Sequence, residues 1–459
     1  MKKQLTWFTS LLGASLLTMG ACGGDSGLTG DDTQMPDAAP TPDAPPGVTV
    51  VDVPAGDIAV DTHFTADHIY ILKGYVFVTG GTLTIDAGTT IKGDNGSALT
   101  ITKDAKLNAV GTADKPIVFT SSAATPASGD WGGLVMAGKG PINVPGGTNK
   151  IEGFADTFGE RIVYGSATPD ATHDCGKLKY ARIEYGGFAL SVDNELNGLT
   201  LTACGSQTVI DFVQVHLGLD DGIEVFGGTV NLNHVVVTQP DDDGLDWDLG
   251  WTGKAQFVII QQRAGRGDKG IEADSNRSDG DLAPRSAPEI WNATLIGSDG
   301  AVGDPQGGMH LRRGTAGKIN NAIIAFFPKF AVDIDNAVPG SVAQFDAGAL
   351  AFKNTYFVKA AAQTAIWPAN FDVGGNPPAE NDGGLDEAAV LGGDATNHQD
   401  VDPQLTDPKG LTAPSWKPAA GSPVLTGCGT PPAGLDQTAT FCGAIGTVDW
   451  TAGWTRFPG

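Results

Sequence analysis

The sequence predicts an all-β solenoid, a parallel β-helix whose coils have about 22 residues or more. Short β-rich pieces separated by Gly, Asn and Asp begin near residue 68, as in Gly81-Thr-Leu-Thr-Ile-Asp-Ala-Gly88. A pattern of an apolar strand followed by an acidic turn then recurs in the middle of the chain. About 410 residues follow the N-terminal region, which is more than one compact core holds. Because no second Pro- or Ser-rich linker divides them, one elongated repeat domain is favoured over two globular domains.

The repeat is clearest in three acidic turns. Asp220-Asp-Gly-Ile-Glu224 recurs as Asp242-Asp-Gly-Leu-Asp246, and each turn follows an apolar strand at the same spacing. A third copy, Asp268-Lys-Gly-Ile-Glu272, comes after a slightly longer interval, and weaker copies end at His310 and Asp333. A propeller blade needs roughly twice this period. Equivalent residues on successive coils are therefore expected to stack about 4.8 Å apart, with apolar ladders in the core.

Other segments resemble a known family. Gly129-Asp-Trp-Gly-Gly-Leu-Val, Ile183-Glu-Tyr-Gly-Gly and the Asp-Asp-Gly-Ile-Glu turn are similar to uncharacterised bacterial surface lipoproteins of the pectate-lyase-like superfamily. Asp402-Pro-Gln-Leu resembles the closing segment of bacterial β-helix proteins. The resemblance covers nearly all of the chain beyond the N-terminal region and implies a right-handed parallel β-helix. The expected boundaries are residues 49–400 for the β-helix and 401–459 for its C-terminal end and cap.

The N-terminus resembles a bacterial lipoprotein signal. Two lysines precede an apolar stretch that is too short for a stable membrane span, and small residues lead directly into Cys22. The resemblance implies a signal peptide over residues 1–21 and a diacylated Cys22, whose acyl chains hold the protein in a membrane lipid layer. An ordinary cleaved signal, in which Cys22 is incidental, is the alternative.

A predicted tether follows the lipidated cysteine. Residues 23–48 contain five Asp and five Pro but no aromatic residue, Lys or Arg. Such a segment cannot bury enough apolar surface to fold. Residues 22–48 are therefore expected to form a disordered linker between the membrane and the folded domain. Because Gly23 instead of Asp follows the cysteine, the protein is expected to be exported to the outer membrane, facing either the periplasm or the outside.

Charge and cysteine content limit the partners and the compartment. The 53 acidic residues outnumber the 28 Lys and Arg residues, which gives a formal charge of −25. A field of this sign repels nucleic acid, so nucleic-acid binding is not expected. Four cysteines besides Cys22 fit an oxidising compartment, and three pairings are open to them. Their separations favour two local disulfides, Cys175–Cys204 and Cys428–Cys442.

The same offset aligns charged side chains. Three columns are expected: Asp220, Asp242 and Asp268; Glu224, Asp246 and Glu272; and Asp221 and Asp243, continued by Lys269. Carboxylates about 4.8 Å apart repel each other, and partial burial strengthens that repulsion. Something is therefore expected to offset their charge, and three interpretations remain open.

The first interpretation is Ca²⁺ as a bound cofactor. Ca²⁺ takes six to eight oxygen ligands, and clustered Asp side chains supply them. The candidate metal ligands are Asp220, Asp242, Asp243, Asp246 and Asp248. No EF-hand or nonapeptide Ca²⁺ pattern accompanies them in the sequence.

The second interpretation is catalysis on an acidic polysaccharide, which the family resemblance implies. Many proteins of the superfamily cleave such sugars with Ca²⁺ and an Arg or Lys base, and others hydrolyse them with carboxylates about 6.5–9.5 Å apart. The candidate catalytic residues are Asp220, Asp221, Asp243, Arg266 and Lys269. The candidate ligand-binding residues are Trp247 and Trp251, which offer rings for stacking on sugars, and Glu224 and Glu272. The Arg-Ile-Lys and His-Gly motifs of the hydrolase family are absent from the sequence.

The third interpretation is ordinary turn chemistry, in which Asp bonds to nearby backbone amides and Gly adopts positive φ. It accounts for each Asp-Gly pair but not for the acids that recur beyond the glycine, at Glu224, Asp246 and Glu272. We therefore expect a lipid-anchored, non-catalytic cell-envelope protein that binds a polysaccharide or an envelope protein along its acidic face, with Ca²⁺. The alternative is a Ca²⁺-dependent polysaccharide lyase or glycoside hydrolase acting on acidic polysaccharide.

Overall fold

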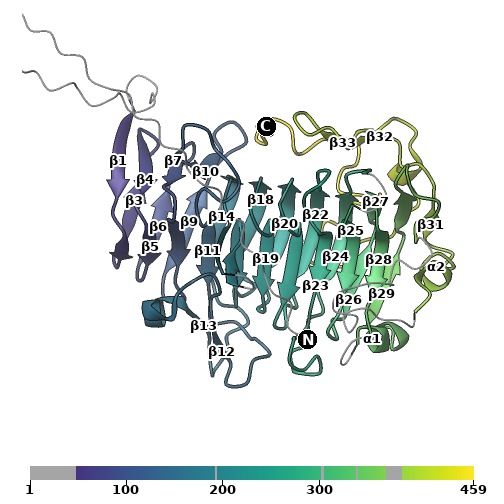
Figure 1. Ribbon diagram of the computed structural model, residues 1–459, viewed down its shortest axis with the longest axis horizontal. Helices are drawn as coiled ribbons and strands as arrows, with labels where there is room; N and C mark the ends of the chain where they lie inside the picture. The colour runs from purple at the N-terminus through teal and green to yellow at the C-terminus, as the bar shows by residue number, and fades with distance from the viewer. Residues whose placement is uncertain (1–47, 192–193, 301–303, 337–339, 368–384, 459) are drawn as a thin grey trace, which may run out of the picture. The chain divides into compact units, whose positions relative to one another are not determined.

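The computed structural model of the protein describes residues of one compact unit (Figure 1). The described ranges are 48–191, 194–300, 304–336, 340–367 and 385–458. The predicted signal peptide, Cys22 and the tether before residue 48 lie outside them. Within the described ranges, no helix has the length and apolar character needed to cross a membrane.

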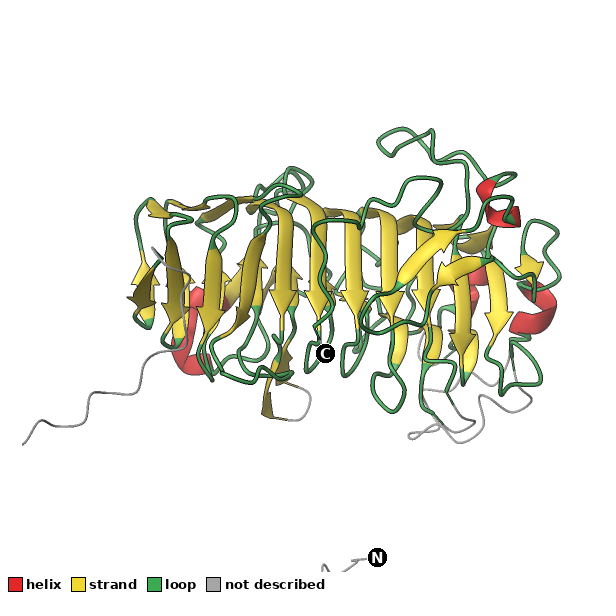
Figure 2. Ribbon diagram, turned by 90° about the horizontal axis from the view of Figure 1, so that it is seen from above, coloured by secondary structure: helices red, strands yellow, loops and turns green. Residues whose placement is uncertain are grey.

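Two large sheets of parallel strands contain most of the described strands, which lie side by side in Figure 2. The first has ten strands: β2 (Gly56–Ile58), β5 (Tyr75–Val78), β8 (Ala98–Ile101), β11 (Leu134–Ala137), β17 (Leu199–Thr202), β19 (Ile223–Phe226), β21 (Leu245–Asp248), β23 (Lys269–Ala273), β25 (Gly307–Leu311) and β28 (Phe330–Ile334). The second has seventeen: β1 (Thr49–Val53), β3 (Thr62–Phe64), β4 (His68–Leu72), β6 (Thr82–Ile85), β7 (Thr90–Gly93), β9 (Lys106–Val110), β10 (Ile117–Ser121), β14 (Gly176–Glu184), β18 (Val209–His216), β20 (Asn231–Thr238), β22 (Lys254–Gln261), β24 (Glu289–Ile296), β26 (Gly317–Asn320), β27 (Ile323–Phe327), β29 (Leu350–Lys353), β30 (Tyr356–Lys359) and β31 (His398–Gln399).

Short strand pairs and short helices lie outside the two large sheets. Three further strand pairs are antiparallel: β12 (Thr148–Lys150) with β13 (Val163–Gly165), β15 (Phe188–Ser191) with β16 (Asn194–Leu196), and β32 (Leu405–Asp407) with β33 (Ser415–Pro418). The described helices are also short: η1 (Asp156–Ile162), α1 (Val342–Asp346), α2 (Glu387–Val390) and η3 (Pro423–Leu425).

Strands of the seventeen-stranded sheet turn a corner at one residue. The corner residues of β18, β20, β22 and β24 have positive φ: Phe212 at 56°, His234 at 49°, Phe257 at 61° and Asn292 at 53°. Parallel pairing stops at each corner and resumes after it. One coil therefore contains a strand of the ten-stranded sheet and the two arms of a bent strand, so the coils have three faces. This arrangement is the predicted parallel β-helix.

Apolar ladders fill the interior, as predicted. Val213, Val235 and Ile223 are each at most 1 % exposed. The coil before the third copy of the repeat is longer than the earlier ones, and its additional residues lie in one part of the coil. Val235 pairs with Val258 at nearly the spacing of the earlier coils, whereas Leu245 pairs with Ile271 at a longer one. The additional residues therefore lie in the turn before β23, where they leave the strand stacking undisturbed.

The two favoured disulfides form, Cys175–Cys204 and Cys428–Cys442. We name residues 401–458 the C-terminal segment. It was expected to close the end of the stack, and that expectation is wrong for most of its length. The segment instead runs back along the side of the coils, as its yellow trace in Figure 1 shows.

Hydrogen bonds and apolar contacts hold the C-terminal segment against the coils. The side-chain amide of Asn321 donates to Gly429 O over 2.7 Å, and that of Gln214 donates to Arg456 O over 2.6 Å. Outward-facing apolar residues of the coils pack with apolar residues of the segment in one cluster. Its members include Val236, Ile259, Ile296, Ile323, Trp416, Cys442, Ile445 and Trp454. An end cap would leave this apolar stripe exposed.

An insertion covers part of the ten-stranded sheet. We name residues 138–175, between β11 and β14, the insertion; it contains β12, η1 and β13. Its buried residues Ile142, Phe154 and Ile162 belong to one cluster with the outward-facing side chains of Phe77 and Val135. The outer face of the ten-stranded sheet is therefore apolar and covered by the insertion at its early coils. The later coils of the same face are not covered by these residues.

Candidate functional site

Charged residues gather on the outer face of the ten-stranded sheet beyond the insertion. Glu224 pairs with Asp246, and Asp246 pairs with Glu272, in the predicted register. The column continues through His310 to Asp333. Because alternate side chains of a strand share a face, these five residues project from the same side of the sheet. The offset of the repeat therefore predicted both the fold and this column.

A second charged column lies two residues further along the strands, and sequence reasoning found only its first member, Asp248. Asp274 follows it on the next coil, where its backbone N–H bonds to Trp247 O. Arg312 comes next: its Nε donates to Asp274 Oδ1 over 2.9 Å, and its guanidinium also bonds to Glu272. Asp274 is only 4 % exposed. The signal for it was the alternation in Glu272-Ala-Asp274, which puts both acids on one face of β23.

The turns that precede these strands hold the other two predicted columns. Asp221 Oδ1 accepts a hydrogen bond from Asp243 N over 2.9 Å, and Asp243 Oδ1 accepts one from Lys269 N. Both carboxyl groups are buried. Each acid thus ties its own coil to the backbone of the next coil, so turn chemistry explains part of the role of Asp221 and Asp243.

Carboxylates from the columns meet in groups of three. In each group, one oxygen from each residue lies within 4.8 Å of the others. The groups are Asp220, Asp221 and Asp242; Asp221, Glu224 and Asp246; Asp242, Asp243 and Asp268; and Asp243, Asp246 and Glu272. Adjacent groups share members, so the carboxylates form one continuous cluster, which we name the acidic cluster.

Burial and mutual repulsion raise the pKa values in the acidic cluster. Burial, followed by the charge of Asp242, raises the pKa of Asp220 to about 8. Burial and the negative charge of Asp268 raise the pKa of Asp242 to about 6. Asp248 belongs to none of the four groups but lies close to them: burial and the charge of Asp246 raise its pKa to about 7, against a backbone hydrogen bond that lowers it. Near neutral pH these groups therefore need protons or a cation to lie so close together.

Glu152 of the insertion joins the acidic cluster, and sequence reasoning missed it. Its pKa is raised to about 7, mainly by burial, while a hydrogen bond with Glu224 lowers it. Burial and the neighbouring carboxylates raise the pKa of Glu224 well above its usual value, and the hydrogen bond with Glu152 adds to this, so the two carboxyl groups share a proton. Asn197 also donates to Glu224 Oε2, over 2.6 Å. Glu152 lies outside the repeat, and no spacing in the sequence marks it.

Asp246 occupies the middle of the acidic cluster. Like three other acids it belongs to two of the four groups, and its charge also raises the pKa values of Glu152, Glu224 and Asp248. Its Oδ1 atom is buried and has no hydrogen-bond partner among the described residues. Burial raises the pKa of Asp246, while the charges of Arg312 and Arg313 lower it. Its unpartnered oxygen is a ready ligand for a hard cation, because such cations prefer carboxylate oxygens.

Comparison with known proteins identifies the fold family. A family model described as the pectate-lyase like beta helix domain matches residues 56–384. The chain belongs to this family. No curated protein and no solved structure matches the chain. The match to the pectate-lyase-like β-helix family covers the coils that carry the acidic cluster.

The proposed stacking of Trp247 and Trp251 on sugars is wrong for this β-helix. Both indoles are fully buried in its core, with ring centroids 5.7 Å apart. Trp247 Nε1 donates to Thr315 Oγ1 over 3.0 Å, and Trp251 Nε1 donates to Val230 O over 2.9 Å. Asp246 faces outwards, so its neighbour Trp247 has to face inwards.

The basic candidates of this pectate-lyase-like chain are each paired with an acid. Lys269 Nζ bonds to Asp268, and Arg266 forms a 3.4 Å ion pair with Asp241, which belongs to none of the three columns. An inverting hydrolase holds its two carboxyl groups about 6.5–9.5 Å apart to admit water, whereas the carboxylate oxygens within each group of three lie within 4.8 Å of one another. This close spacing suits a cation better than an attacking water.

Proposed function

We propose that this β-helix is a non-catalytic cell-envelope protein that binds an acidic glycan through Ca²⁺ held in the acidic cluster. In this proposal Cys22 anchors the protein to the outer membrane, and residues 23–48 hold the β-helix away from the lipid. The observation that supports it most is the convergence of carboxylates on Asp246, whose buried Oδ1 has no partner among the described residues.

The donor chemistry fits Ca²⁺. Every group in the acidic cluster offers carboxylate oxygens, which are the ligands that Ca²⁺ takes in largest number. Asp220, Asp242, Asp243, Asp246 and Asp248 are the candidate ligands, and Glu224 and Glu272 border them. A bound cation offsets the repulsion that otherwise raises the pKa values. It also gives uronate carboxylates of a glycan a positive charge to bind, on a face that alone repels them.

The surrounding basic side chains support binding over catalysis. Arg312 contacts Glu272 and Asp274, Arg313 also contacts Asp274, and Lys269 contacts Asp268. A guanidinium or ammonium engaged in this way is a poor general base, because its carboxylate partner stabilises the protonated form.

Ca²⁺ is expected to raise the thermal unfolding midpoint of the protein at pH 7.5 by several degrees relative to chelator, because a ligand that binds only the folded state stabilises it by about 2.7 kcal/mol at 100 times Kd. Asp246→Asn should remove most of this difference. Asp346→Asn, at an exposed position of α1, should keep it. The measurement is differential scanning fluorimetry with Ca²⁺ and with EDTA. Identical curves for the unaltered protein would exclude a Ca²⁺ site.

Glycan binding is tested separately with uronate-containing polysaccharides. Binding measured by calorimetry should require Ca²⁺ and disappear in EDTA. The same mixtures are assayed for unsaturated ends by absorbance and for new reducing ends. Release of either product, abolished in Asp246→Asn, would replace the binding proposal with a lyase or hydrolase.

A further inference from the structure

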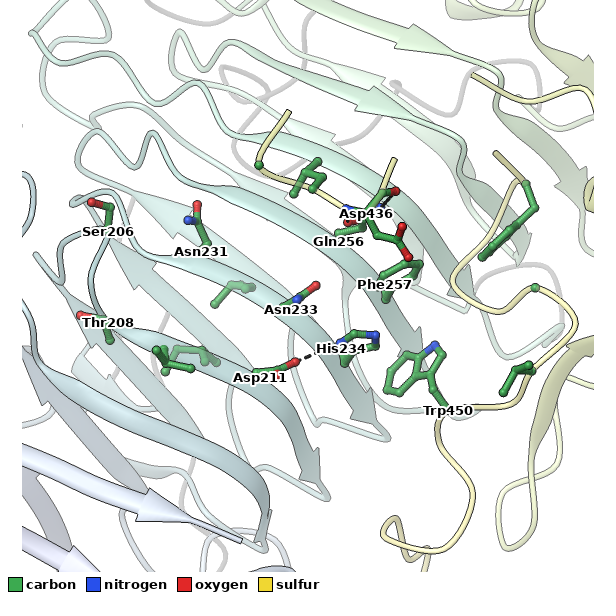
Figure 3. A pocket seen from close by; sticks show the side chains of 18 of the residues that line it. Ser206, Thr208, Asp211, Asn231, Asn233, His234, Gln256, Phe257, Asp436 and Trp450 are labelled. Carbon is green, nitrogen blue, oxygen red and sulfur yellow. Dashed lines mark hydrogen bonds and ion pairs between the residues drawn. The ribbon is translucent and has the colours of Figure 1, made fainter. Parts of the chain in front are cut away.

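A pocket of about 600 Å³ lies on another face of the coils, between the outer side of β18, β20 and β22 and the C-terminal segment (Figure 3). Small-molecule sites typically occupy about 300–1,000 Å³. Outward-facing side chains of the three strands form one wall, and residues between 434 and 450 form the other. No residue of the acidic cluster lines it, so this pocket is separate from the proposed Ca²⁺ site.

The strand wall contains a buried polar group without a partner. Asp211, Asn233 and Gln256 are paired in register on neighbouring strands and line the pocket. Gln256 is engaged, because its side-chain amide donates to Asp436 O over 3.2 Å and accepts from Asp436 N over 2.7 Å. The side-chain oxygen of Asn233 is buried and has no hydrogen-bond partner among the described residues. Such a group is costly to leave unsatisfied, so it favours a ligand that donates a hydrogen bond.

His234 supplies a second hydrogen-bonding group. Burial raises the pKa of Asp211, but hydrogen bonds from His234 and Lys179 outweigh burial and lower it, so Asp211 is a carboxylate. A carboxylate only accepts hydrogen bonds. His234 Nδ1 therefore donates to Asp211 Oδ1 over 2.9 Å, which leaves Nε2 available for a hydrogen bond with a ligand hydroxyl group. Stacking on Phe212 and Phe257, at centroid distances of 4.1 and 4.6 Å, fixes the imidazole.

The opposite wall is largely apolar and includes the indole of Trp450. The ring centroid of Trp450 lies 5.0 Å from that of His234, in an edge-on arrangement. Leu435, Phe441 and Val448 are its other apolar side chains, and Val448 is 76 % exposed; Asp436 and Thr447 also lie on this wall. Among the tryptophans that the structure describes, only Trp450 is not buried. Its fluorescence therefore reports on this pocket more directly than on any other part of the surface.

We infer that the pocket binds a neutral sugar ring, with one hydroxyl group donating to Asn233 Oδ1, another hydrogen-bonded to His234 Nε2, and an apolar ring face against Trp450. A sugar ring combines hydroxyl donors with an apolar face, which matches the two walls. Among the described residues that line the pocket there is no Lys or Arg to pair with a uronate. Of the two acids that line the pocket, Asp211 is paired with Lys179 and His234, whereas Asp436 is exposed to solvent and accepts hydrogen bonds from Thr438.

Titration of neutral disaccharides against the full-length protein tests this inference. Maltose, cellobiose, lactose and diacetylchitobiose are added in EDTA, and tryptophan fluorescence is recorded. At least one is expected to change the emission saturably. Digalacturonate and choline should not. Because EDTA removes Ca²⁺, success or failure here is independent of the proposed function. No saturable change with any neutral disaccharide would overturn the inference.

Two variants locate the binding. Asn233→Leu removes the buried acceptor and is expected to weaken binding about tenfold or more, measured by fluorescence and calorimetry. Asn108→Ala is the matched control, since Asn108 lies on the same sheet several coils away and does not line the pocket. Trp450→Phe should abolish the fluorescence change while calorimetry still detects binding. Affinity that is unchanged in Asn233→Leu, or a fluorescence change that persists in Trp450→Phe, would place the sugar elsewhere and contradict the inference.

Discussion

Replacing Trp247 by alanine is expected to lower the free energy of unfolding by about 3–5 kcal/mol, the usual cost of truncating a buried aromatic side chain. The indole of Trp247 is fully buried, contacts Trp251 and donates a hydrogen bond to Thr315. Its removal leaves a cavity inside the stack and takes away the hydrogen bond that Thr315 Oγ1 accepts, although this hydroxyl still donates to Ala316 O. Urea denaturation followed by circular dichroism measures the change.

The matched control for this prediction is Trp450→Ala. Trp450 is only partly buried and lines the pocket, so the loss of stability should be clearly smaller. Calcium-dependent glycan binding should survive in whatever fraction of Trp247→Ala remains folded. A Trp247→Ala protein that keeps its stability but no longer binds glycan would support a ligand-binding role for Trp247 and contradict its structural role in the core.

In EDTA, the unfolding midpoint is expected to fall as the pH rises from about 4 to about 8. Unfolded aspartate ionises near 3.8, whereas burial and like charge raise the pKa of Asp220 to about 8 and that of Asp242 to about 6. A carboxyl group with a raised pKa in the folded state favours folding fully below its unfolded pKa, and that contribution is lost as the pH passes through the folded value. Saturating Ca²⁺ should flatten the profile, because the cation replaces the protons.

Asp221→Asn sharpens this pH prediction. The amide oxygen still accepts the hydrogen bond from Asp243 N, while one buried like charge disappears. The midpoint in EDTA at pH 8 should therefore rise relative to the unaltered protein, and the slope with pH should decrease. Asp346→Asn, at an exposed site, should change neither quantity. A flat profile of the unaltered protein in EDTA would show that the acidic cluster is not under electrostatic strain.

The sequence predicted the features that repeat locally. A fixed offset places Glu224, Asp246 and Glu272 in one column, because a coil of constant length returns each position to the same place. The same reasoning could have placed Trp247 in the core, since alternation along a strand sends the neighbour of an outward Asp246 inwards. The period of the repeat aligns residues on neighbouring coils, whereas the alternation within one strand decides which of them face the core.

Features outside the repeat could not be predicted in this way. Glu152 reaches the acidic cluster from the insertion, and the distance along the chain to Glu224 carries no periodic signal. The course of the C-terminal segment depends on contacts between parts of the chain that are far apart in sequence. One clue was present: Val235-Val-Val237 is apolar at both inward and outward positions, which is typical of a strand covered on both faces. The pocket exists only because that segment returns over β18 to β22.

The path of the C-terminal segment changes how the stack comes apart. Coils of a solenoid otherwise contact only their neighbours and fray one at a time from an open end. Here the C-terminal segment is hydrogen-bonded to Asn321 through Gly429 and to His216 through Pro458, so it links several coils. A coil beneath this segment cannot unfold until the segment has detached. The central coils therefore gain their full resistance to unfolding only after the C-terminal segment has docked against them.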